Sequence, residues 1–163
     1  MRKIALTLAA LGAVVATPAL AATATNTMPV SVNVINSCTV AATPMAFGAP
    51  TAIGGANIDT TSTITLACTN GSTYDVALDN GLNAASGQRY MSNGAATPVK
   101  IPYNVSAASA GGANWGSAVG TTVTGSAGTS GAVVLTAYGR IPSSATSVGA
   151  GSYSDTVTVT VTF

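Results

Sequence analysis

The chain has 163 residues, of which 47% are hydrophobic and only 6% are charged, and it contains no histidine. Disordered chains show the opposite balance, with few apolar residues and high net charge, so the composition indicates a folded protein. Five basic and four acidic residues provide no basic stripe, which excludes a nucleic-acid partner. The length suits one domain, and the abundance of small and β-branched residues predicts an all-β fold with many short turns.

The first 21 residues are typical of a secretory signal peptide. Arg2 and Lys3 precede an apolar run over 4–15, and Ala19-Leu20-Ala21 has the form of a cleavage site. A membrane anchor is the alternative, but the run is short for a span and no stop-transfer charges follow it. We therefore predict that residues 1–21 are removed and that the chain is exported.

Residues 22–36 form a polar, small-residue start followed by an alternating segment. The apolar positions of that segment share one face and are Met28, Val30, Val32 and Val34. A period of two predicts a strand, and Pro29 places it at a sheet edge or at a strand start. An ordinary first strand of a sandwich is one interpretation of this pattern, and a segment that pairs with another chain is the other.

Cys38 and Cys68 are the two cysteines of the chain. Two cysteines in an exported protein usually pair, and a disulfide closing a loop of this size stabilises the fold by roughly 3–4 kcal/mol. A catalytic thiol or a metal site is the alternative, but there is no histidine to activate a thiol or to complete a ligand set. We predict a Cys38–Cys68 disulfide.

The middle of the chain contains further strand patterns, and no segment keeps a helical period. The strand patterns cover 62–68, 74–78, 99–105, 119–124 and 133–138. The first two flank Asn70-Gly71 and are predicted to form a hairpin. Pro102 removes a backbone donor, so its strand is expected at an edge or with a bulge. Trp115 is expected to cover one end of a sandwich rather than to bind a ligand.

The last eight residues give the clearest strand pattern. Val157, Val159, Val161 and Phe163 share one face, and four threonines share the other. The sequence stops on the apolar Phe163, so nothing after it supplies a neighbouring strand. The pattern therefore raises the question of what covers the far side of this strand.

Catalytic chemistry has little support in the sequence. There is no histidine and no glutamate, and Asp75 and Asp79 fall in a strand and in a turn. Acid–base catalysis needs paired groups in matched environments, whereas turn-forming and solvated aspartates are common. We expect no enzyme activity, no cofactor and no metal.

Short motifs in a specific order and spacing make the chain recognisable as a whole. They are Cys38-Thr39-Val40, Cys68-Thr69-Asn70-Gly71, Ala77-Leu78-Asp79-Asn80-Gly81, Arg89-Tyr90-Met91, Tyr103-Asn104, Trp115-Gly116, Tyr138-Gly139-Arg140-Ile141-Pro142 and Gly151-Ser152-Tyr153-Ser154-Asp155-Thr156. With them the chain resembles the spore coat protein U domain family, which includes subunits of archaic, Csu-type chaperone–usher pili. The segment after Asn104 departs from the family pattern, since Val105-Ser106-Ala107-Ala108 lacks a second tyrosine and a charge.

The resemblance implies an incomplete immunoglobulin-like β-sandwich that lacks its last strand and is completed by donor-strand complementation. Residues 22–36 would be the donor segment and 37–163 the sandwich. The partners implied are neighbouring subunits in a homo- or hetero-polymer, a periplasmic chaperone and an outer-membrane usher. The implied role is a structural subunit, exported through the periplasm to the cell surface, that supports adhesion and biofilm formation. Val157, Val159, Val161 and Phe163 would then form the acceptor groove and chaperone-binding strand.

Two other functions remain open from the sequence. One is a secreted spore-coat-like or ligand-binding sandwich that is complete as a monomer, and the other is the tip adhesin of the same pilus. Only Asn36 and Ser37 separate the alternating segment from Cys38. Two residues reach at most about 7 Å, whereas packed sheets lie roughly 10 Å apart, so a donor segment does not easily cross to its own groove.

Overall fold

A computed structural model describes residues 21–163, so the predicted signal peptide lies outside the described residues except for Ala21. The chain divides into two units, one ending at Asn33 and the other comprising Val34–Phe163. Residues 21–37 have no regular secondary structure, and the strand predicted over 28–35 is therefore not formed. The reason is that an extended segment becomes a strand only when its backbone groups pair with a neighbouring edge.

The second unit contains eight strands and, within residues 34–163, no helix. The strands are β1 (Cys38–Ala42), β2 (Ile58–Cys68), β3 (Thr73–Leu78), β4 (Arg89–Ser92), β5 (Lys100–Ser106), β6 (Val123–Ser126), β7 (Ala132–Ile141) and β8 (Val159–Thr162). In the described part of the chain, no helix has the length and apolar character needed to cross a membrane.

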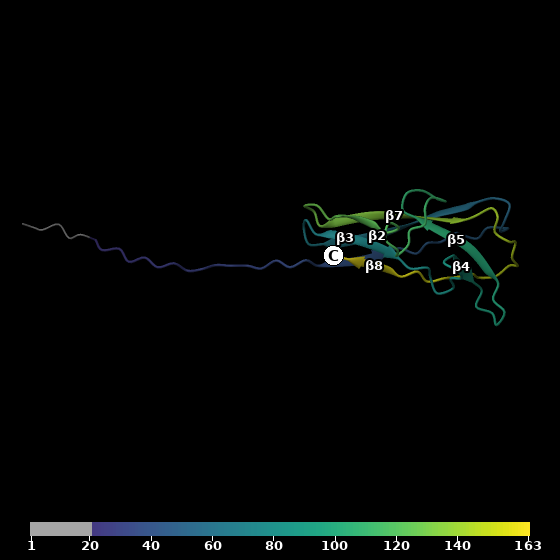
Figure 1. The fold of residues 1–163 in the computed structure, drawn as a ribbon, viewed down its shortest axis with the longest axis horizontal. Coiled ribbons are helices and arrows are strands. Elements are labelled where there is room, and N and C mark those ends of the chain that lie inside the picture. The colour runs from purple at the N-terminus through teal and green to yellow at the C-terminus, as the bar shows by residue number, and fades with distance from the viewer. Residues whose placement is uncertain (1–20) are drawn as a thin grey trace, which may run out of the picture. The chain divides into compact units, whose positions relative to one another are not determined.

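The strands form two antiparallel sheets. One sheet has five strands in the order β1-β2-β7-β5-β4, and the other has three in the order β6-β3-β8. Figure 1 shows β2 and β7 of the first sheet running along the same direction as β3 and β8 of the second. Inward-facing residues of both sheets form one core, whose fully covered members include Ile64, Leu66 and Val76. The predicted all-β sandwich is thus confirmed.

The predicted hairpin between 62–68 and 74–78 is wrong. β2 pairs with β1 and β7, whereas β3 pairs with β6 and β8 in the other sheet. Both edges of β2 are occupied, so the turn at Asn70-Gly71 carries the chain across to the second sheet. Gly71 makes this turn with φ +77°, a conformation that glycine adopts without strain.

Other strand boundaries differ from the sequence pattern. β7 was expected to end at Tyr138 but continues to Ile141, and β8 begins only at Val159. β4 was not predicted, because Arg89–Ser92 shows no alternation of polar and apolar residues. At Pro102, β5 pairs with β4 alone, since its pairing with β7 starts at Asn104. Pro102, which has no backbone N–H, therefore lies where β5 has a single neighbouring strand. This agrees with the prediction that Pro102 lies at a sheet edge.

The loop over 107–122 covers one side of the core and is pinned there by two buried side chains. Trp115 is 2% exposed, and its Nε1–H donates to the carbonyl oxygen of Val76 at 2.8 Å. Arg89 is 1% exposed and donates from Nε to the Asp79 carbonyl at 2.9 Å and from Nη2 to the Trp115 carbonyl at 2.8 Å. Burial lowers the pKa of Arg89. We refer to Arg89, Trp115 and this loop as the closed side.

Candidate functional site

The inner face of β1 is uncovered. Val40 lies opposite Leu66 of β2, so the two side chains project from the same face of the sheet. Leu66 is 0% exposed, yet Val40 is 41% exposed. A core-facing valine is thus left in solvent because no strand lies over β1.

The other sheet ends on the same side of the core with β8. Val157, Val159 and Val161 are half-buried and pack against the core. β8 pairs with β3 on one side only, so within the described residues it is an edge strand. Figure 1 shows β8, in yellow, running along the border of the domain.

The backbone groups of these two edges also lack strand partners. Thr158 exchanges hydrogen bonds with Asp79, so the valines on either side of it direct their N–H and C=O groups away from β3. In β1, Thr43 donates to the Thr63 carbonyl at 2.9 Å, so Val40 and Ala42 direct their backbone groups away from β2. Cα atoms of β1 and β8 approach within 8 Å, but the strands do not pair.

A cavity of about 450 Å³ opens between the two edges. The segment after β1 and the segment before β8 form its two sides, and the core forms its floor. The apolar lining residues include Ala42, Met45, Phe47, Ile64, Leu78, Met91, Val105, Tyr153, Val157 and Val159. We call this cavity, with the facing edges of β1 and β8, the open groove.

Hydrogen bonds hold the β8 side of the open groove in place. Tyr103 donates from Oη to Asp155 Oδ2 at 2.7 Å, and Asn83 donates its backbone N–H to Asp155 Oδ1 at 3.1 Å. Burial and the hydrogen bond to Asp155 raise the pKa of Tyr103, which keeps its hydroxyl protonated as a donor. Gly81 approaches the Asp155 carboxylate so closely that a Cβ there would overlap it.

Asp79 fixes the start of the same strand. Its Oδ1 accepts hydrogen bonds from the backbone N–H groups of Gly81 and Thr158, both at 2.9 Å. Burial raises the pKa of Asp79, but the hydrogen bonds from Thr158 and Gly81 and the positive charge of Arg89 together lower it more, so the net pKa lies below its ordinary value. The aspartates near the groove therefore support its wall.

The acceptor residues predicted from the sequence line the cavity of the open groove only in part. Val157 and Val159 line the cavity, and Val161 packs on the core opposite Val76 without lining it. Phe163 is 51% exposed. The predicted donor residues Met28, Val30, Val32 and Val34 are between 73% and 87% exposed.

Sequence reasoning missed the opposite side of the open groove. Val40, Met45 and Phe47 belong to β1 and the loop after it, and that loop had been interpreted only as a connection. A signal was available for Val40, because it shares the alternation that starts at Cys38. Nothing comparable marks Met45 and Phe47, whose place depends on the path of the loop.

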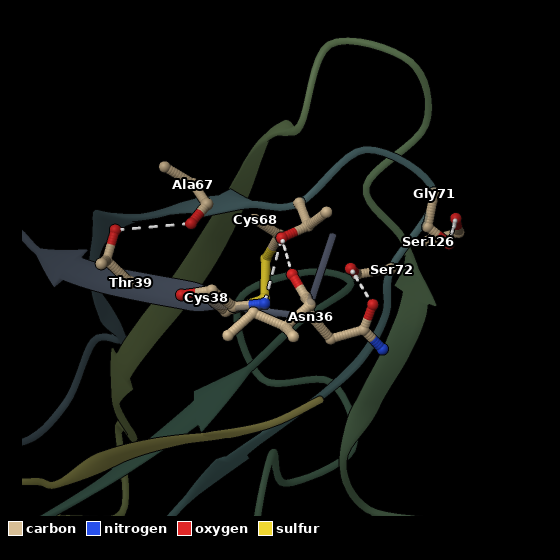
Figure 2. The surroundings of a disulfide bond; sticks show 11 residues. Asn36, Cys38, Thr39, Ala67, Cys68, Gly71, Ser72 and Ser126 are labelled. Atoms are coloured by element: carbon tan, nitrogen blue, oxygen red, sulfur yellow. Dashed lines mark hydrogen bonds between the residues drawn. A yellow bond between two sulfur atoms is a disulfide. The ribbon is translucent and has the colours of Figure 1, made fainter. Parts of the chain in front are cut away.

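The predicted disulfide is present and lies where the first residues of the sandwich meet the end of β2 (Figure 2). Cys38 and Cys68 are opposite one another in the register of β1 and β2, with their Cα atoms 4.0 Å apart. The bond therefore joins the edge strand β1 to the neighbouring strand β2 at the point where the chain enters the sandwich.

A comparison with protein families decides the identity of this fold. The model of the Spore Coat Protein U domain matches residues 24–160. The chain belongs to the Spore Coat Protein U domain family. A comparison with curated proteins finds no significant match.

Two solved structures are similar to this Spore Coat Protein U domain. The CsuC–CsuE chaperone–tip adhesion subunit pre-assembly complex of archaic chaperone–usher Csu pili from Acinetobacter baumannii matches with a TM-score of 0.56 and 21% identity. The match covers 80% of this chain and 40% of the other chain, so this chain spans less than half the length of the matched chain. HdaB, the minor tip subunit of the E. coli Hda pilus, matches with a TM-score of 0.41 and 14% identity over 76% of this chain and 79% of the other. The first likeness shows that the fold is an immunoglobulin-like sandwich.

Proposed function

We propose that this protein is a structural subunit of an archaic chaperone–usher pilus and polymerises by donor-strand exchange. The open groove accepts the N-terminal segment of a neighbouring subunit, and a periplasmic chaperone occupies the groove before assembly at an outer-membrane usher. The assembled pilus is displayed at the cell surface, where it supports adhesion and biofilm formation. Residues 22–36 act as the donor segment after removal of the signal peptide.

The observation that carries this proposal is the uncovered inner face between β1 and β8. Val40 and Val159 are core-facing valines that remain partly in solvent, and the backbone groups beside them point toward an empty edge. An added strand would pair the backbone groups and cover the valines at once, because it brings backbone donors and acceptors together with apolar side chains.

The chain also carries a segment with the right pattern to be such a strand. Met28, Val30, Val32 and Val34 are exposed in the described chain, and each would contribute roughly 1.5–3 kcal/mol on full burial. No charged residue occurs between 22 and 36, so no charge would be carried into the groove. The segment and the groove are therefore chemically matched.

Insertion requires a small movement of the groove edges. Two strands with a third between them lie about 9.6 Å apart, which is twice the usual spacing of paired strands. Cα atoms of β1 and β8 now approach within 8 Å. We expect the edges to separate where they are closest, and the cavity between 42–47 and 153–157 to receive the first inserted side chain.

The competing functions fit the described residues less well. A monomer that is complete by itself would have Val40 and the edge of β8 covered. A catalytic role would need paired acid–base groups, whereas three of the four aspartates are engaged in the fold: Asp59 pairs with Arg140, and Asp79 and Asp155 accept hydrogen bonds. We therefore favour a structural role over a catalytic one.

Assembly of variants in cells tests the proposal. Deletion of residues 22–36 should leave a subunit that binds its chaperone and ends fibres but cannot extend them. Val32→Asp should abolish fibres at unchanged domain stability, because a charge would have to be buried in the groove. Thr27→Asp, a charge in the same segment outside the apolar face, is the matched control and should still assemble. Normal fibres from Val32→Asp would refute the donor role.

A further inference from the structure

The motif Cys68-Thr69-Asn70-Gly71 does more than provide a disulfide cysteine. The hydroxyl of Thr69 donates to the carbonyl oxygen of Ile35 at 3.0 Å and accepts the backbone N–H of Ser37 at 3.1 Å. The backbone N–H of Thr69 donates to the carbonyl oxygen of Ser37 at 2.8 Å. One residue thus holds both ends of the three-residue segment 35–37, which lies directly before Cys38.

The middle residue of that segment is held from the same turn. Ser72 donates from Oγ to Asn36 Oδ1 at 3.2 Å, and Figure 2 shows the two side chains directed at one another near the disulfide. Ser72 is buried, at 4% exposure. Residues 35–37 are therefore attached through their backbone at both ends and through a side chain in the middle.

The turn that makes these contacts is itself fixed to the loop before β7. Gly71 donates its N–H to the Gly128 carbonyl at 2.8 Å, and Ala127 donates to the Ser72 carbonyl at 2.9 Å. Cys68 donates to the Gly131 carbonyl at 2.7 Å. Thr69–Ser72 is consequently a rigid base for whatever it binds.

The disulfide alone does not explain these contacts. It joins Cys38 to β2 and leaves the three preceding residues free to rotate. If the donor segment only had to be attached to the sandwich, three freely rotating residues would be enough. Ordering three exposed residues is costly in conformational entropy. The hydrogen bonds to residues 35–37 therefore fix the direction in which the chain enters the sandwich.

We propose that Thr69, with Asn36 and Ser72, forms a clasp that orients residues 35–37 and thereby sets the angle between successive subunits in the fibre. This inference rests on the proposed function. There, the donor segment of a chain is inserted into the groove of a neighbouring subunit, while Cys38 of the same chain belongs to its own sandwich. Residues 35–37 follow Val34, the last of the apolar donor residues, and then connect the inserted part of the donor segment to its own sandwich. Thr69 is a positioning residue, since it touches the connector and not the open groove.

Amide exchange measured by NMR tests the clasp without fibres. The mature chain carrying Val32→Asp serves as the background, because it is expected not to assemble and its change lies outside the clasp. Thr69→Val should speed exchange of the Ser37 amide by roughly two- to tenfold, the effect of one lost hydrogen bond. Thr69→Ser should restore protection. Thr65→Val, an exposed position of β2 with no side-chain hydrogen bond among the described residues, is the matched control and should change nothing.

Electron microscopy of fibres tests the consequence. Thr69→Val fibres should show a shifted or broader distribution of angles between neighbouring subunits, whereas Thr69→Ser and Thr65→Val fibres should match the wild type. Asn36→Ala, which removes the contact with Ser72, should give a smaller change in the angles. It replaces Thr69→Val in this experiment if the Thr69→Val variant unfolds at too low a temperature. Wild-type angles in both Thr69→Val and Asn36→Ala fibres, or an unchanged Ser37 amide, would overturn the clasp. Absence of fibres from the wild-type chain would refute the proposed function instead, and the amide measurement would still decide whether the clasp exists.

Discussion

The closed side and the open groove border the same core but are finished in opposite ways. On the closed side, Trp115 and Arg89 are buried and their polar atoms bond to carbonyl groups. In the open groove, Val40 is 41% exposed and the edges of β1 and β8 face one another unpaired. The difference teaches that the chain covers its own core where a loop lies over it. Under the proposed function, a strand from another subunit covers the core at the open groove.

Truncating one residue on each side should give the sharpest contrast. Trp115→Ala should lower the free energy of unfolding by about 3–5 kcal/mol, because it opens a large cavity and removes the buried hydrogen bond from Nε1–H to the Val76 carbonyl. Val40→Ala should cost less than about 1 kcal/mol, because Val40 is already partly in solvent. Urea unfolding of the two variants measures both values. Equal costs would mean that the groove is covered in solution.

Removing the disulfide should have the next largest effect. Cys38→Ser should lower the free energy of unfolding by roughly 3–4 kcal/mol, because the unfolded chain gains the entropy of an opened loop. Since β1, among the described strands, pairs with β2 alone, the loss should appear as fast amide exchange in β1 before global unfolding. Subunit yield in the periplasm and melting under reduction check the effect. Unchanged melting under reduction would show that the bridge contributes nothing.

The smallest expected effect concerns pH. Because the net pKa of Asp79 lies below its ordinary value, its carboxylate stabilises the fold above about pH 4, and this stability is lost as pH falls through the lower folded-state pKa. Asp79→Asn should therefore flatten the fall of unfolding free energy below about pH 4. The Asp59 pKa is lowered chiefly by the hydrogen bond from Arg140, so Asp59→Asn should act in the same range. The Asp59 side chain is exposed, so high salt should weaken its effect more. A variant Asp79→Asn with the wild-type pH profile would contradict the assigned role.

The sequence predicted the parts of the fold that depend on local alternation. The valines of β8, the strand at β3 and the disulfide were all accessible in this way, because period-two patterns and paired cysteines are local signals. The partner of each strand was not accessible. β2 and β3 flank a turn typical of a hairpin, yet both edges of β2 are taken, one by the preceding strand β1 and the other by β7, which lies far away in sequence.

The same limit applies to the site. The apolar face of residues 157–163 indicated an acceptor strand, whereas Met45 and Phe47 come from a loop whose path no pattern predicts. Arg89 had been recognised only as part of a motif. The available signal was that charged residues are rare: in a chain with 6% charged residues, an arginine is a candidate for a structural contact.

Two similar alternations show why strand formation itself needs context. Residues 28–35 and 156–163 have the same period, but the first has no regular secondary structure and the second is a strand where it pairs with β3. A pattern therefore states which face would be buried, and a neighbouring edge decides whether a strand forms. Under the proposed function, that neighbour for residues 28–35 belongs to another subunit.

Amide exchange at Val157, Val159 and Val161 tests the central claim most directly. The purified mature chain is measured alone, at a concentration where sedimentation shows a monomer, and then with a synthetic peptide of residues 22–36. We expect fast exchange in the chain alone and at least about tenfold slower exchange with the peptide, because new backbone hydrogen bonds form along β8. A peptide with Val32→Asp should have no effect. Slow exchange in the monomer alone, unaffected by the wild-type peptide, would show that the groove is already filled and would contradict the account.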